Sequence, residues 1–264
     1  MTRRGQNSVL AVTVFAVMIP FLPIVLWSFS QQWFYPKVLP NSWGTRAWQY
    51  VFGTAGTQMI SALLQSVTLS VVVAGISVAI AIPAGRVLGL YHFRGKRLML
   101  ITLTFPVIVP QLSVAMGLHL WFLKLGLADS FLGVVLVHLT MSVPYAVFVM
   151  WGVFSNYNPE FEDQARSLGA SRRKVIVHVM IPLTFPGIVV AGLFSFLLSW
   201  SQYLNTLILG GGKLTTLPIL LFSLMGSGDR PVASAVSLVF VAPAFVVLLF
   251  SARYLGSNYM AGAW

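Results

Sequence analysis

The side chains best placed for chemistry lie inside apolar segments of the sequence. One set recurs at positions i, i+4, i+7 and i+11, a spacing that places its members on one face of a helix. Its members are Ser195, Ser199, Gln202 and Thr206, with Tyr203 and Asn205 beside them. A second set repeats at i, i+4 and i+7 and consists of His138, Ser142 and Tyr145. Such groups either line a path for a polar solute or join helices by hydrogen bonds, and both interpretations stay open for each residue.

The chain lacks the residue patterns that catalysis or metal binding requires. It has no cysteine, and neither His119 nor His138 has a carboxylate near it in sequence. The His-Glu-x-x-His motif of zinc proteases is absent. Gly75-Ile76-Ser77, with His119 as its base, resembles a serine nucleophile over three residues only. We therefore predict no catalytic residue and no metal ligand, and an intramembrane enzyme stays as the weaker alternative function.

The composition indicates a chain that is surrounded by lipid. Hydrophobic residues make up 58% of it and charged residues 8%, with a mean hydropathy of +0.87. A soluble domain carries about a quarter charged residues. A helix that crosses a bilayer needs about 20 apolar residues, and six segments meet that length. They are 9–29, 60–84, 98–123, 131–154, 183–209 and 232–252. We predict an all-α integral membrane protein, whose first helix is retained because its apolar run is too long for a signal peptide.

The basic residues predict the orientation of these helices. The net charge is +11, from 16 Lys and Arg against 5 acids. One side of the predicted topology carries Arg3, Arg4, Arg86, Arg94, Lys96, Arg97, Arg166, Arg172, Arg173, Lys174 and Arg253. The other side carries Lys37, Arg46, Lys124, Lys213 and Arg230. Because cytoplasmic loops are enriched in Lys and Arg, we expect both termini in the cytoplasm. The basic residues form no single face, so we expect no nucleic acid partner.

Prolines lie inside or at the ends of the predicted spans. They are Pro20, Pro23, Pro83, Pro106, Pro110, Pro144, Pro186 and Pro243. Each removes a backbone donor and bends its helix. Bent helices suit a pathway that opens and closes, although proline is common in membrane helices generally.

The loop at 155–182 has the pattern of two short helices joined by a hinge. Asn158 suits the N-cap and Pro159 the first helical position. Three acids, Glu160, Glu162 and Asp163, follow in the first turns, where the helix dipole favours them. Gly169 is suited to end this helix in a left-handed conformation. Ser171 then caps a second helix that begins with Arg172-Arg173-Lys174 and runs to Pro182.

The first of these helices carries a narrow apolar stripe. Phe161, Ala165 and Leu168 recur at i, i+4 and i+7. An exposed helix with such a stripe is typical of a segment that docks in the groove of a partner. The alternative is a helix that lies on the membrane, but its acidic start opposes the negative charge of the inner leaflet. The basic second helix suits the membrane surface.

This loop resembles the signature of the type I, MetI-like permeases of ATP-binding-cassette importers. Their motif is Glu-Ala-Ala, three residues, Gly, nine residues, Ile, one residue, Leu-Pro. The matching residues are Asp163, Gln164, Ala165, Gly169, Val179, Ile181 and Pro182. Asp replaces Glu, Gln replaces the first Ala, Val replaces Ile and Ile replaces Leu. The resemblance extends over most of the chain, including Phe93-Arg94-Gly95-Lys96 before the third predicted helix.

The resemblance implies a function and a set of partners. It implies one permease domain, 1–264, with the six-helix MetI-like fold, in a bacterial-type inner membrane. Such a permease forms half of a translocation pathway with a second permease subunit, for which we expect a distinct sister. A dimer of cytoplasmic ATPase subunits docks on the 155–182 loop and binds ATP and Mg²⁺, so we expect no cofactor in this chain. A substrate-binding protein delivers the solute from outside.

No nucleotide motif of the chain's own competes with this interpretation. Gly210-Gly211-Gly212-Lys213 is followed by Leu214, where a phosphate-binding loop needs Ser or Thr. An ion-coupled secondary transporter stays as an alternative. Such carriers need an ionisable group near the midplane, whereas all five acids lie in predicted loops.

The segment after 195 looks like that of permeases for polyamines, ferric iron, thiamine or phosphonates. The resemblance therefore includes a polyamine-like small solute among the substrates. Polyamine-type permeases often carry acidic residues where this chain has Ser201 and Gln202. That departure weakens the case for a cation.

Overall fold

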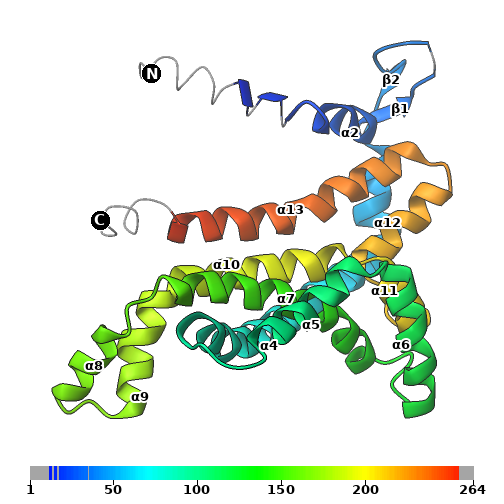
Figure 1. Ribbon diagram of the computed structural model, residues 1–264. Coiled ribbons are helices and arrows are strands. Elements are labelled where there is room, and N and C mark those ends of the chain that lie inside the picture. Colours follow the sequence, from blue (N-terminus) through cyan, green and yellow to red (C-terminus); the bar gives the residue numbers. More distant parts are fainter. Residues whose placement is uncertain (1–11, 14, 17, 35, 256–264) are drawn as a thin grey trace. The chain divides into compact units, whose positions relative to one another are not determined.

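The computed structural model describes residues 12–255 except 14, 17 and 35, and in this part the chain is α-helical apart from one small hairpin. The elements are α2 (Phe21–Ser28), β1 (Ser30–Gln32), β2 (Ser42–Trp43), α3 (Arg46–Gln49), the π-helical turn η1 (Tyr50–Thr54), α4 (Gly56–Leu90), α5 (Lys96–Ile108), α6 (Gln111–Leu125), α7 (Phe131–Ser155), α8 (Glu160–Ser167), α9 (Arg172–Val175), the π-helical turn η2 (Ile176–Met180), α10 (Ile181–Ser201), α11 (Leu204–Gly210), α12 (Leu217–Gly226) and α13 (Arg230–Leu255). Figure 1 labels all of them except α3, η1 and η2. Two compact units share them. One holds the described residues up to Leu63 with Leu217–Pro243, and the other holds Leu64–Thr216 with the described residues from Ala244.

Four helical segments within the described residues are long and apolar enough to cross a membrane. They are Gly56–Leu90, Phe131–Ser155, Arg172–Ser201 and Arg230–Ser251, and the bent pair α5–α6 makes a fifth if it counts as one span. The predicted spans 60–84, 131–154 and 232–252 lie inside α4, α7 and α13. Of the predicted span 9–29, residues 9–11, 14 and 17 lie outside the described residues, and α2 covers Phe21–Ser28. Arg3 and Arg4 and the side chain of Arg253, used for orientation, also lie outside them.

The predicted span at 98–123 is not one continuous helix, because the structure breaks it into α5 and α6 at an angle of 100°. The cause is Pro110, which precedes the first residue of α6. Its ring disfavours helical backbone at the preceding residue, and Val109 is extended, with φ −70° and ψ 136°. Pro106 stays inside α5. The sequence indicated a bend in this segment but not two separate helices.

The predicted helix 183–209 is also divided. Helix α10 ends at Ser201, Gln202 is extended with ψ 104°, and α11 begins at Leu204. At its other end α10 continues without a break from α9 through the π-helical turn η2. The second short helix of the loop is therefore the beginning of the membrane helix, and the prediction that it is separate and ends at Pro182 is wrong.

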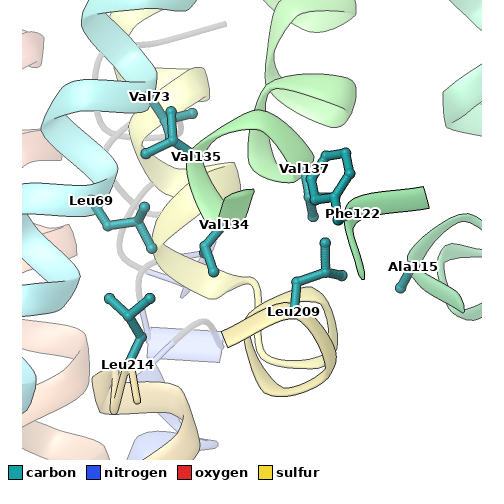
Figure 2. Close-up of a cluster of buried hydrophobic side chains, with 9 residues drawn as sticks. All are labelled: Leu69, Val73, Ala115, Phe122, Val134, Val135, Val137, Leu209 and Leu214. Atoms are coloured by element: carbon teal, nitrogen blue, oxygen red, sulfur yellow. The ribbon is translucent and has the colours of Figure 1, made fainter. Parts of the chain in front are cut away.

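The core of the second unit is built on α7. Figure 1 shows α7 and α10 side by side, and Figure 2 shows an apolar cluster formed by α4, α6, α7 and α11 with the segment after it. This cluster consists of Leu69, Val73, Ala115, Phe122, Val134, Val135, Val137, Leu209 and Leu214. Farther along α4, Gly85 and Gly89 allow its backbone to approach α7 closely. A Cβ on either would lie 2.5 Å from the Cβ of Met150 or of Phe154, so only glycine fits.

The first unit contains elements that the sequence did not predict. Strands β1 and β2 pair antiparallel, with Ser30 opposite Trp43, and α12 is an apolar helix too short to count as a span. The guanidinium of Arg46 donates two hydrogen bonds, 2.9 and 2.8 Å long, to the carboxylate of Asp229. These bonds hold the pKa of Asp229 below its ordinary value. The pair joins α3 to the loop before α13.

Candidate functional site

Helix α8 ends as its sequence predicts but begins one residue later than predicted, with Pro159 as its N-cap and Glu160 as its first residue. The side-chain oxygen of Asn158 accepts a hydrogen bond of 2.9 Å from the backbone N–H of Glu160. At the other end Gly169 has φ +84°. The N–H of Ala170 donates to the carbonyl of Ala165 at 3.0 Å, and that of Gly169 donates to Arg166 at 2.9 Å. These two hydrogen bonds form a Schellman motif, which requires a left-handed backbone conformation that glycine adopts without strain.

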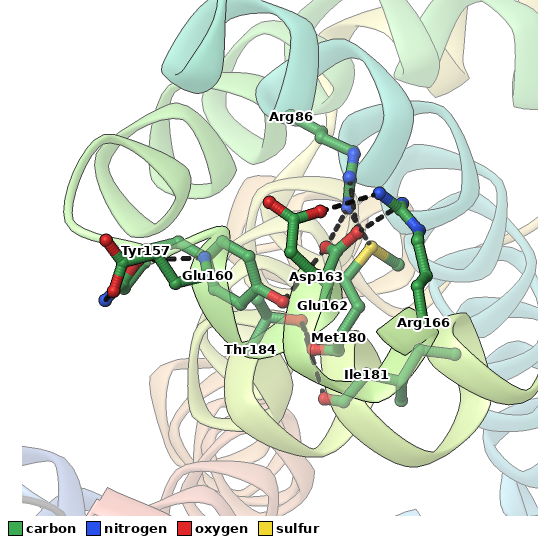
Figure 3. A network of polar contacts seen from close by, with 10 residues as sticks. Arg86, Tyr157, Glu160, Glu162, Asp163, Arg166, Met180, Ile181 and Thr184 are labelled. Carbon is green, nitrogen blue, oxygen red and sulfur yellow. Dashed lines mark hydrogen bonds and ion pairs between the residues drawn. The ribbon is translucent and has the colours of Figure 1, made fainter. Parts of the chain in front are cut away.

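The inner face of α8 is fixed by one buried carboxylate, that of Glu162, which is 3% exposed. Figure 3 shows Arg86 reaching it from α4. The two guanidinium nitrogens of Arg86 lie 2.6 and 2.8 Å from the two carboxylate oxygens. The hydroxyl of Tyr157 donates to the same carboxylate at 3.0 Å, and Arg166 adds a bond of 3.2 Å. Because Arg86 also lies 2.8 Å from the sulfur of Met180, this network joins α4, α8 and η2.

The electrostatics of this network hold Glu162 ionised. The hydrogen bond from Arg86 is the largest cause that lowers the pKa of Glu162, against an opposing effect of burial. Burial, and then the bond to Glu162, raise the pKa of Tyr157. A lowered carboxyl pKa stabilises the folded state fully above the ordinary carboxyl pKa, and this contribution is lost only as the pH falls through the lowered value. The network is therefore intact throughout the neutral range.

The sequence did not single out this role of Glu162, which was grouped with Glu160 and Asp163 as a residue favoured by the helix dipole. One signal pointed to it. Arg86 lies near the end of a long apolar helix, where an arginine needs a counter-charge, and the chain offers 5 acids. Sequence spacing does not reveal which of them Arg86 contacts, since the partners are 76 residues apart.

The outer face of α8 carries the predicted apolar stripe. Phe161 is 48% exposed and Leu168 is 89% exposed, while Ala165 is half-buried. At about 100° per residue these side chains lie roughly a third of a turn from Glu162. Asp163 and Gln164 are exposed, and Asp163 lies 3.0 Å from Arg166. Of the remaining motif residues, Val179 and Ile181 are half-buried and Pro182 is exposed. One face thus anchors α8 to its own subunit and the other is open.

The two predicted polar sets meet inside the second unit. His138 of α7 is fully buried. Its Nδ1 lies 2.8 Å from the hydroxyl of Ser199 on α10, and its Nε2 lies 2.9 Å from the hydroxyl of Thr206 on α11. The Thr206 hydroxyl also donates to the carbonyl of Gln202 at 2.9 Å. The imidazole therefore bridges the break between α10 and α11. These contacts within one subunit favour the helix-joining interpretation for His138, Ser199 and Thr206.

Of the other members of the two polar sets, some are enclosed in the protein interior and two line a cleft. Ser142 and Ser195 are buried, and neither side-chain oxygen has a hydrogen-bond partner among the described residues. Tyr203 is half-buried and Asn205 is buried. Tyr145 and Gln202 line a cleft of about 520 Å³ together with Val107, Ile108, Val109, Pro110, Gln111, Met141, Leu198 and Ser201. The cleft therefore lies where both helix breaks meet, that after α5 and that after α10.

The family model described as binding-protein-dependent transport system inner membrane component matches residues 81–259. The chain is similar to the spermidine/putrescine transport system permease protein PotC of Haemophilus influenzae, at 23% identity over 93% of this chain and 94% of the relative. It is also similar to the inner membrane ABC transporter permease protein YcjP of Escherichia coli K12, at 24% identity over 99% of this chain and 96% of the relative.

A solved structure has the same fold. It is described as a bacterial ABC transporter involved in the import of the acidic polysaccharide alginate, and a chain of it matches with a TM-score of 0.73 at 17% identity. The match covers 95% of each chain.

Proposed function

The chain belongs to the family of binding-protein-dependent transport system inner membrane components, and from this premise we propose which of its parts couple and conduct transport. It is a multi-pass inner-membrane permease subunit of an ATP-binding-cassette importer, a transport component without catalytic activity of its own. ATP binding belongs to a partner ATPase. The resemblance seen in the sequence and the family match agree on this point.

Helix α8 is the coupling helix, and its outer face docks on the cytoplasmic ATPase. The observation that carries this is the exposure of Leu168 and Phe161, at 89% and 48%, on a helix that Glu162 anchors about a third of a turn away. Large exposed apolar side chains at helical spacing favour a groove in a partner. The bonds of Glu162 to Arg86 would pass a displacement of α8 to α4. The predicted motif residues at 163–169 shape the end of α8. Those at 179–182 lie where η2 joins α10.

Leu168→Glu is expected to release the ATPase subunits and to lower ATP-driven uptake at least about tenfold. A carboxylate buried in a contact costs more than the roughly 1.4 kcal/mol that corresponds to tenfold. Co-purification of the ATPase in mild detergent and uptake in proteoliposomes measure the effect. Ser167→Glu, which places the same side chain on an exposed position off the stripe, is the matched control. Normal assembly and uptake with Leu168→Glu, or equal losses in both variants, would contradict this docking face.

The cleft at the two helix breaks is part of the translocation pathway. Backbone that leaves the helix at membrane depth is tolerated only where protein buries it or where it lines a cavity. Both interruptions, at Val109–Pro110 and at Gln202, border the same cleft. Tyr145 and Gln202 are therefore the members of the predicted polar sets that contact solute. The other half of the pathway comes from a second permease subunit, a distinct sister, and a binding protein delivers the solute, as in the alginate transporter solved with its periplasmic protein.

The proposed membrane topology has six spans, with both termini and α8 in the cytoplasm. The support is the count of Lys and Arg, eleven on that side and five on the other. The chain has no cysteine, so single cysteines report the side directly. Arg94→Cys is expected to react with a membrane-impermeant maleimide in inverted vesicles only, and Lys213→Cys in right-side-out vesicles only. The reverse labelling pattern would overturn the topology.

An ion-coupled carrier is the competing function. Glu162 and Asp229 are engaged in ion pairs, and Asp163 pairs with Arg166 on the exposed surface of α8. None of the residues that line the cleft is an acid. Uptake that continues with the ATPase inactivated would favour the carrier.

A further inference from the structure

The cleft is lined by Gln202, whose side-chain amide is bonded to that of Asn205, and both amides are only partly satisfied. Gln202 is 6% exposed and Asn205 is 2% exposed, and the amide nitrogen of Asn205 donates to the side-chain oxygen of Gln202. The amide nitrogen of Gln202 and the side-chain oxygen of Asn205 have no partner among the described residues. If the nitrogen and oxygen of both side-chain amides are exchanged, Gln202 carries the unpaired acceptor and Asn205 the unpaired donor, so one of each still lacks a partner.

Two unpaired polar groups at such depth are costly. Each buried donor or acceptor without a partner loses about 1–3 kcal/mol relative to its hydrated state. Native structures leave few such groups. A hydroxyl group both donates and accepts hydrogen bonds, so a solute hydroxyl in the cleft satisfies the free group of Gln202 in either orientation of its amide. An ammonium group has donors only and leaves the Gln202 donor unpaired.

The rest of the cleft lacks the charge that an ion needs. Its polar lining comes from Gln111, Tyr145, Ser201 and Gln202, and its other residues are apolar. A charge removed from water without a counter-charge costs several kcal/mol. A polyamine carries several such charges, and an acidic sugar also carries charge. The uncharged lining therefore does not favour a polyamine substrate for this cleft, despite the likeness to a spermidine/putrescine permease at 23% identity.

We propose that the cleft recognises an uncharged, hydroxyl-bearing solute, such as a polyol or a neutral sugar, through Gln202. This inference rests on the proposed role of the cleft in the pathway. Gln202 binds the solute, and Asn205 holds the Gln202 side chain by the bond between their amides. Tyr145 and Gln111 supply further hydrogen bonds from α7 and α6.

The test is ATP-driven uptake from a mixture. Proteoliposomes hold the full complex of this chain, its sister and the ATPase, with ATP inside and the binding protein and a defined metabolite mixture outside. The mixture contains spermidine and putrescine, neutral sugars and polyols, and phosphonate and carboxylate anions. Mass spectrometry of the lumen is expected to show a neutral hydroxylated solute. Accumulation of a polyamine or of an anion would overturn the inference but leave the importer assignment intact, whereas no ATP-dependent accumulation of any component would overturn the importer assignment itself.

Variants at the amide pair test the residues. Gln202→Glu keeps the acceptor, removes the donor and adds a charge, and it is expected to lower uptake of the neutral solute at least tenfold. At a cation site the same change would raise uptake. Thr140→Val removes a hydroxyl from α7 outside the cleft, where it bonds to its own helix, and is the control. Wild-type uptake with Gln202→Glu, in a complex that co-purifies intact, would exclude Gln202 from recognition.

Discussion

Charge reversal at either end of the Arg86–Glu162 pair is expected to release α8 from α4, and reversal at both ends to restore much of the contact. Glu162→Arg places a third cation beside Arg86 and Arg166, and Arg86→Glu places two buried carboxylates together. Removing one partner of a buried pair costs about 3–5 kcal/mol, because the other charge is left without compensation. This cost applies to the Arg86–Glu162 pair, because the two side chains are only 23% and 4% exposed. Each single variant should therefore lower thermal stability and ATP-driven uptake, and the double variant should recover part of both.

The measurement is a double-mutant cycle on thermal unfolding in detergent, with uptake measured in parallel. Arg97→Glu is the matched control, because Arg97 is exposed and forms no salt bridge among the described residues. It should change stability by less than about 0.5 kcal/mol, as surface substitutions do. Additive losses in the double variant would mean that the two side chains act independently, and the mechanical link between α8 and α4 would then have no support.

In the proposed coupling role of α8, this link passes a displacement of the short exposed helix to the long helix α4. A helix held only by its loop would absorb a push from the ATPase by bending at Asn158 or Gly169. The carboxylate of Glu162 instead bonds to α4 at 2.6 and 2.8 Å and to Tyr157 at 3.0 Å. Because α4 runs from Gly56 to Leu90 without interruption, a displacement at its Arg86 end reaches the cluster around Leu69 and Val73.

The parts of this fold that follow from the sequence are those that local chemistry decides. Helix α7 is a single apolar run, begun by Ser130, whose hydroxyl accepts from the N–H of Gly133. The end of α8 follows from Gly169, because left-handed backbone depends on one residue, and the start was predicted to within one residue from Asn158 and Pro159. The break at Pro110 was indicated by proline chemistry, although not its angle.

The remaining parts depend on contacts between distant residues. The break at Gln202 has neither proline nor glycine, and it is spanned by His138 from another helix. The periodic set at 195–206 therefore assumed one continuous helix, which the structure divides into α10 and α11. In the same way, Glu162 takes its role from Arg86, and the β1–β2 hairpin pairs strands of three and two residues, which are too short to produce a readable alternation.

Gly85→Ala and Gly89→Ala are expected to destabilise the protein, whereas Gly75→Ala on the same helix is not. The added Cβ at Gly89 would lie 2.5 Å from the Cβ of Phe154 and 2.7 Å from its carbonyl carbon, and that at Gly85 makes the same approach to Met150. Backbone atoms cannot yield as a flexible side chain does, so α4 and α7 must move apart. Overpacking of this kind costs about 1–3 kcal/mol. At Gly75 nothing lies within 4 Å, and alanine favours a helix over glycine by about 1 kcal/mol.

All three substitutions replace glycine by alanine, so the direction in which each shifts the unfolding midpoint separates the effect of packing from that of helix propensity. If close packing decides, the unfolding midpoint falls for Gly85→Ala and Gly89→Ala and stays or rises for Gly75→Ala. One kcal/mol corresponds to roughly 2–4 °C in a chain of about this size. Shifts of the same sign at all three positions would mean that propensity dominates and that α4 and α7 do not rely on the two glycines. Phe154 belongs to the apolar cluster that packs against Tyr157, and Tyr157 bonds to Glu162. Separation of α4 and α7 should therefore also loosen α8. The two variants Gly85→Ala and Gly89→Ala are expected to lose ATP-driven uptake along with stability.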